Sequence, residues 1–172
     1  MSRPLRTIVE EIAGLNDLFN AILGVSIVQT LHPPASPKQI DALEAHLDVA
    51  LPPSYRELLG ICNGWSGFAA RVDLLSVEQQ MQGEYARYIH RWRGIQWAYG
   101  ESVPVEAIIF GIELGTNKAR LFDTATADAS GEMQAIWWQD GELHRYDNLT
   151  DMLEQYVDRL VFMIDRKRGR AS

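Results

Sequence analysis

The chain has 172 residues, of which 47% are hydrophobic and 23% are charged, and these values fit one globular domain. It shows no apolar run of about 18 residues, so we expect no membrane span. It also shows no N-terminal signal core, so we expect no secretion. A single cysteine excludes an internal disulfide and suits a reducing cytoplasm, which is the expected compartment. The formal net charge is −7, and it is −11 without the four basic residues at 166–170. This acidity argues against nucleic acid as a direct ligand, because neutralising phosphates needs clustered Lys and Arg.

The N-terminal part of the chain is predicted to be a helical arm followed by a linker. Apolar residues recur at helical spacing up to Gly24, which is placed to stop the helix, and a His-Pro-Pro-Ala linker follows. Because about 30 residues rarely fold alone, we expect this arm, 1–35, to pack on the main domain, 36–165. A basic tail is expected over 166–172.

The stretch from Ser36 to Gly64 has the clearest helical pattern. Ser36 and Gln39 are spaced as a capping box, so a helix is expected to begin there. The Leu-Pro-Pro sequence at 51–53 breaks that helix, since proline lacks a backbone donor, and a second apolar stripe follows. Gly64 is expected to end the second helix in the left-handed conformation.

The rest of the chain changes from helical periodicity to strand periodicity and back. Ser76 and Gln79 form a second capping box, which opens a helix with an aromatic stripe that is expected to stop at Gly94. Asp140-Gly141 is a hairpin signal, and Asn148 or Thr150 is placed to begin a last helix. The predicted strands are 71–75, 107–112, 119–123, 133–138 and 142–146. This order predicts an α+β domain, a mainly antiparallel sheet with helices packed on one face.

The Ser36 to Gly64 stretch also carries a family resemblance. The residues that carry it are Ile40, Leu43, Glu44, Leu51, Pro52, Tyr55, Arg56, Leu59, Asn63 and Gly64. This motif resembles that of the SUKH superfamily, which includes the Smi/Knr regulators of fungal cell-wall synthesis and many bacterial immunity proteins. The resemblance implies the same α+β architecture. We expect the motif positions Leu51, Pro52, Tyr55, Asn63 and Gly64 to be structural.

The sequence shows no pattern that points to catalysis. Cys62 lies on an apolar helical face, where a core cysteine is the expected reading. The histidines have no zinc-ligand spacing; they are His32, His46, His90 and His144. No P-loop, Rossmann or nucleophile-elbow motif occurs. We therefore predict no enzyme, no metal and no cofactor.

A protein-binding module is the remaining interpretation. The resemblance implies an immunity protein that neutralises a bacterial toxin, for example a basic nuclease domain, by direct binding; a Smi/Knr-like regulatory scaffold is the alternative. No membrane partner is expected, and the oligomeric state stays open. Composition and predicted loops give the expected partner-binding residues as Trp65, Phe68, Tyr99, Glu101, Asp123, Asp128 and Glu132. For Trp65 and Phe68, on a glycine-flanked loop, packing beneath the sheet is the competing and preferred reading.

Overall fold

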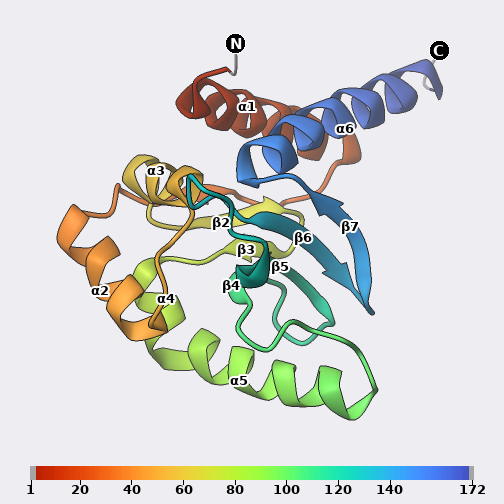
Figure 1. Cartoon of the computed structure of the whole chain (residues 1–172). Coiled ribbons are helices and arrows are strands. Elements are labelled where there is room, and N and C mark those ends of the chain that lie inside the picture. The colour runs from red at the N-terminus through yellow and green to blue at the C-terminus, as the bar shows by residue number, and fades with distance from the viewer. Residues whose placement is uncertain (1–2, 171–172) are drawn as a thin grey trace.

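The structure is a computed structural model that describes residues 3–170, and within them seven strands form one antiparallel sheet (Figure 1). The order of the strands in the sheet is their order in the chain. They are β1 (Thr30–Leu31), β2 (Trp65–Ala69), β3 (Val72–Leu74), β4 (Ile108–Ile112), β5 (Lys118–Asp123), β6 (Gln134–Gln139) and β7 (Glu142–Tyr146). The α+β class and the antiparallel sheet predicted from the sequence are confirmed.

The central strands are apolar on both sides because both faces of the sheet are covered. In β4, Ile108 and Phe110 join one buried cluster, whereas Ile109 and Ile112 join another. A strand buried on both faces reads as a continuous apolar run instead of an alternating one. This explains the apolar character of the stretch predicted as a strand at 107–112.

Three helices cover the first face: α1 (Leu5–Leu23), α3 (Pro53–Ile61) and α6 (Leu149–Arg170). α1 and α6 lie side by side across the top of the molecule in Figure 1. Beneath α3, the rings of Phe110 and Phe122 stack with centroids 4.2 Å apart, and Tyr55 contacts both. Aromatic pairs of this kind add to the stabilisation from area burial, so this cluster anchors α3 to the sheet.

The opposite face of the sheet is covered by α5 (Gly83–Ala98), while α2 (Pro37–Leu47) and α4 (Val77–Met81) lie together at one end (Figure 1). Trp92 of α5 is buried edge-to-face against Trp138 of β6, with ring centroids 6.1 Å apart. The sequence placed all helices on one face. The structure differs here, because the sheet has a second apolar face that α5 covers.

Two predicted boundaries are wrong. The helix expected over 76–94 is two helices, since the extended backbone of Gln82, φ −155°, separates α4 from α5. α5 also runs through Gly94 to Ala98. The glycine costs the helix only about 1 kcal/mol, and burial of Trp92 and Gln96 on either side of it offsets that cost.

The predicted caps are largely confirmed. Ser36 and Ser76 each form a complete capping box, and the left-handed Gly24 ends α1. At the last helix, Asn148 accepts a hydrogen bond from the Asp151 backbone (2.9 Å), so Asn148 is the cap. α6 continues to Arg170, so the described part of the basic tail is helical. Within the described chain, none of the helices combines the length and the apolarity that crossing a bilayer needs.

Candidate functional site

Trp65 and Phe68 are core residues, which confirms the preferred reading of their packing and corrects their inclusion among the partner-binding residues. They lie on strand β2 with exposed fractions of 0% and 1%. The register of β2 shifts within the strand and Gly67 has φ +67°, so two side chains three positions apart both turn toward the helices. Phe68 packs on Tyr156 of α6, with ring centroids 4.9 Å apart. Fully buried rings offer no surface to a partner.

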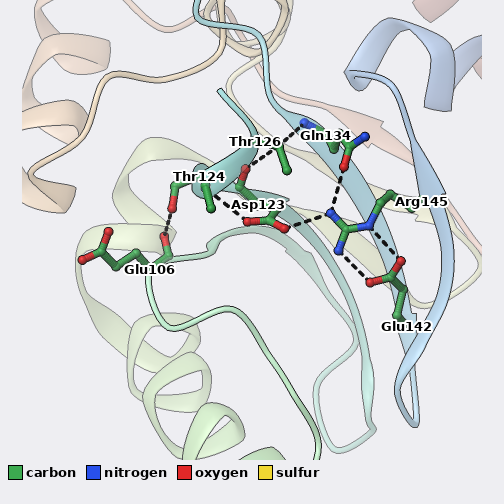
Figure 2. Close-up of polar contacts among 8 residues, drawn as sticks. Glu106, Asp123, Thr124, Thr126, Gln134, Glu142 and Arg145 are labelled. Atoms are coloured by element: carbon green, nitrogen blue, oxygen red, sulfur yellow. Dashed lines mark hydrogen bonds and ion pairs between the residues drawn. The ribbon is translucent and has the colours of Figure 1, made fainter. Parts of the chain in front are cut away.

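Asp123, at the end of β5, belongs to an internal polar cluster (Figure 2). Its carboxylate accepts a hydrogen bond from Arg145 Nη1 (2.8 Å) and another from the Ala125 backbone (3.2 Å). Arg145 also donates to Gln134 (3.0 Å) and to both carboxylate oxygens of Glu142 (2.8 Å each). One guanidinium therefore ties three neighbouring strands together.

Arg145 is ion-paired with both carboxylates of this cluster, Asp123 and Glu142. The hydrogen bonds from Arg145 hold the pKa of Glu142 below its usual value, and those to Glu142 and Asp123 raise the pKa of Arg145. Asp123 is 9% exposed, so little of its carboxylate is open to solvent. The cluster therefore links the side chains of β5, β6 and β7.

Two more of the predicted acids, Asp128 and Glu132, organise the loop between β5 and β6. One carboxylate oxygen of Asp128 accepts from the Ser130 backbone (2.8 Å), the Ser130 hydroxyl (2.7 Å) and the Glu132 backbone (3.0 Å), and these bonds lower the pKa of Asp128. Glu132 accepts from the backbone and the hydroxyl of Ser54, each at 2.7 Å, and so caps the start of α3. Both carboxylates make internal contacts, and a binding role for them stays a prediction.

Tyr99 and Glu101 lie on an exposed surface at the end of α5. Tyr99 is 81% exposed, and it is accompanied by Trp97 at 46% and Val105 at 76%. The loop is held against the helix, because Trp97 Nε1 donates to the Val103 carbonyl (3.3 Å). We call this region the α5-end surface, comprising Trp97, Tyr99, Glu101, Val105 and Glu106. It combines exposed aromatic and acidic side chains on a fixed frame.

The cysteine and two of the histidines lie in contacts that point to no reactive group. Cys62 is buried, and burial raises the pKa of its thiol to about 11, so the unreactive thiol form dominates at neutral pH. His32 Nε2 lies 3.0 Å from the Ser66 hydroxyl, and His144 packs on the ring of Tyr146. Among residues 3–170, no group of three His, Cys, Asp or Glu side chains is arranged to hold a metal.

Sequence reasoning missed a pocket of about 450 Å³ on the α1–α6 face of the sheet. It lies between the end of α1, α6 and strands β2, β3, β5 and β6. Arg120 and Trp137 face each other in register on β5 and β6, and Arg159 of α6 joins them. Arg120, a charged residue inside the apolar sequence of β5, is a sequence signal for this pocket, but the sequence of the strand does not identify its cross-strand neighbours.

The model of the SMI1 / KNR4 family (SUKH-1) matches residues 34–155, well over half of the chain. The chain belongs to the SUKH-1 family. No curated protein matches it. The SUKH-1 match runs from just before α2 into α6, so it includes Arg120 and Trp137 but neither α1 nor Arg159.

The SUKH-1 motif residues make structural contacts. Leu51 and Tyr55 are buried, and the Tyr55 hydroxyl accepts a hydrogen bond from Gln80 (2.7 Å). Pro52 is the N-cap of α3, also buried. The Asn63 side chain accepts from the Val77 backbone (2.8 Å), so it caps α4.

Gly64 is structural for a different reason from the one expected. α3 ends at Ile61, and its C-cap, Cys62, is extended, so Gly64 does not cap the helix. Its φ is +95°, and a Cβ there would lie 2.9 Å from the Ser76 backbone nitrogen. The position needs glycine because of this close backbone approach.

Proposed function

We propose that this SUKH-1 protein is a non-catalytic protein-binding module, and that it acts as an immunity protein that neutralises a bacterial toxin by direct binding. The observation that carries the proposal is the α5-end surface. Tyr99 exposes four fifths of its area at a helix end, so its side chain contributes little buried area to the stability of the fold. Tyrosine and tryptophan are enriched among the residues that dominate interface energies.

The charge of this surface favours a basic partner. Glu101 and Glu106 follow the exposed aromatic residues in the chain, and the chain as a whole carries −7. Complementary charge speeds encounter and lowers affinity for like-charged competitors. A toxin domain that binds nucleic acid, such as a nuclease, has the basic surface that would complement these acids.

The test is affinity capture from the native cell with the wild type and with Tyr99→Ala, followed by titration of the captured partner. We expect one basic toxin protein, bound near nanomolar affinity, whose binding weakens as salt rises and whose activity is lost at stoichiometric addition. Removing an interface aromatic should weaken binding about tenfold or more.

Phe162→Ala is the matched control, because Phe162 is a 64% exposed aromatic on α6, away from the α5-end surface. Its affinity should equal that of the wild type. Equal affinities of Tyr99→Ala and wild type would contradict the assigned surface. A partner that is a regulatory protein, bound with little dependence on salt, would instead support the alternative, a scaffold of the Smi/Knr kind.

A further inference from the structure

Arg120 is buried, and no acidic residue within 3–170 serves as its counter-ion. It is 5% exposed, and its one hydrogen bond goes to the carbonyl of the preceding residue, Ala119, at 3.0 Å. Among the described residues no carboxylate forms an ion pair with it. Burial lowers the pKa of its guanidinium to about 10, which leaves the group charged at neutral pH. A buried charge without a counter-ion is unfavourable for folding. The cation–π contact of Arg120 with the Trp137 ring offsets part of this cost but does not neutralise the charge.

A second cation, Arg159, contacts the same tryptophan ring as Arg120. The guanidinium carbons of Arg120 and Arg159 lie over the Trp137 ring, at 4.5 and 4.2 Å from its centroid. The nearby positive charge of Arg159 further disfavours a charge on Arg120. The indole nitrogen of Trp137 is also buried and has no hydrogen-bond acceptor. Three donor groups thus lie together with no anion among the described residues.

These donors line the apolar pocket on the α1–α6 face. Of the described residues that line it, none is acidic, and its third cation, Lys118, is paired with Glu113 at 2.9 Å. The apolar part of the lining is formed by Phe19, Leu23, Val25, Ile27, Val72 and Met163. A volume of about 450 Å³ is within the range of small-molecule sites, which are mostly apolar with a few polar groups that orient the ligand.

We propose that this pocket binds a small amphipathic anion, with its negatively charged head at Arg120 and Arg159 and its apolar body against the side chains of α1 and α6. A carboxylate or a phosphate head matches the fork of donors on each guanidinium. The bound anion supplies the counter-charge that Arg120 lacks. This site is independent of the α5-end surface, which lies at the other face of the sheet.

The test is calorimetric titration of the whole protein with decanoate and decyl phosphate, using decanol and acetate as matched probes. Decanol keeps the apolar body without the charge, and acetate keeps the charge without the body. We expect decanoate or decyl phosphate to bind at least tenfold more tightly than decanol, and the tighter of the two identifies the head group. No binding of either anion, or decanol binding as tightly, would overturn the proposal.

Two variants locate the ligand. Arg120→Met removes the charge at nearly constant volume, and we expect affinity for the anion to fall about tenfold or more while the melting temperature is kept or raised. Arg159→Gln changes an exposed residue, so it should leave the fold intact, and we expect it to lower the affinity for the anion severalfold. This variant tests the site even if Arg120→Met folds poorly. Arg71→Met, an exposed arginine outside the pocket, is the control. Unchanged affinity in folded Arg120→Met and in Arg159→Gln would overturn the site.

Discussion

Arg120 and Asp123 lie three residues apart on β5 and are both buried, but they face opposite sides of the sheet. Asp123 is paired with Arg145, whereas Arg120 contacts a backbone carbonyl and the Trp137 ring but no carboxylate among the described residues. The sequence Lys-Ala-Arg-Leu-Phe-Asp predicts a strand, but it does not indicate which residues of the neighbouring strands contact it. The sequence alone therefore does not distinguish Asp123, which has a counter-ion, from Arg120, which has none among the described residues. The register of the sheet does.

Gly64 and Gly60 give a matched pair of substitutions at the residue scale. Gly64→Ala should destabilise the protein by about 1–3 kcal/mol, because the new Cβ meets the Ser76 backbone at 2.9 Å and φ is +95°. Gly60→Ala should stabilise it by about 0.5–1 kcal/mol, because Gly60 lies within α3 with no atom within 4 Å of the new Cβ. Urea unfolding measures both, and equal stabilities would refute the close-approach explanation.

At the element scale, the register of β5, β6 and β7 depends on Arg145. Arg145→Met leaves the buried Asp123 carboxylate without its cation, and we expect a loss of about 1–2 kcal/mol, reduced by the partial exposure of Arg145. Lys38→Met, at an exposed position on α2, is the control and should change stability by less than about 0.5 kcal/mol. Both are measured by denaturant unfolding at neutral pH.

The pH dependence of the Arg145 effect follows from the lowered pKa of Glu142. A carboxyl whose pKa is depressed in the folded state adds stability above its unfolded pKa of about 4.3, and that stability is lost as pH falls through the folded value. The difference between wild type and Arg145→Met should therefore be full at pH 7 and shrink below about pH 4. A difference that is constant across this range would show that the ion pairs contribute nothing.

The elements that the sequence predicted well are those with their own local signals. The capping boxes at Ser36 and Ser76, the left-handed Gly24 and the Asp140-Gly141 turn act within a few residues, and the structure contains each of them. The errors arise where tertiary packing overrides local preference. Gly94 remains helical because its neighbours on α5 are buried.

The candidate site was predictable only in part, for a related reason. Tyr99 and Glu101 are exposed or half-exposed as expected. Glycines flank Trp65 and Phe68, so the sequence placed them on a loop and left two readings open, interface anchors or packing beneath the sheet. Pairing with β1 and β3 makes the segment a strand with both rings buried. The pocket was not predicted, because it joins residues from both ends of the chain, such as Phe19 and Arg159, and Arg120 alone does not indicate it.

On the scale of the whole molecule, α1 is outside the family match yet part of the main core. Ile8 and Ile12 are fully buried in the same cluster as the α3 aromatics. Asn16 of α1 donates to the Phe68 carbonyl (2.7 Å), and the Tyr156 hydroxyl of α6 donates to Asn16 (3.2 Å). Residues far apart in the sequence thus share one hydrogen-bonded contact. We infer that α1 unfolds together with the matched segment 34–155.

Ile8→Ala tests this cooperativity, with Leu18→Ala on the same helix as the control. Ile8 is 0% exposed and Leu18 is 36% exposed. Ile8→Ala should lower the free energy of unfolding by about 2–4 kcal/mol, against about 1 kcal/mol or less for Leu18→Ala. Far-ultraviolet circular dichroism and tryptophan fluorescence should report the same shifted midpoint, because the tryptophans lie outside α1. An early loss of helix with an unchanged fluorescence midpoint would mean that α1 is an independent arm docked on a self-sufficient SUKH-1 domain.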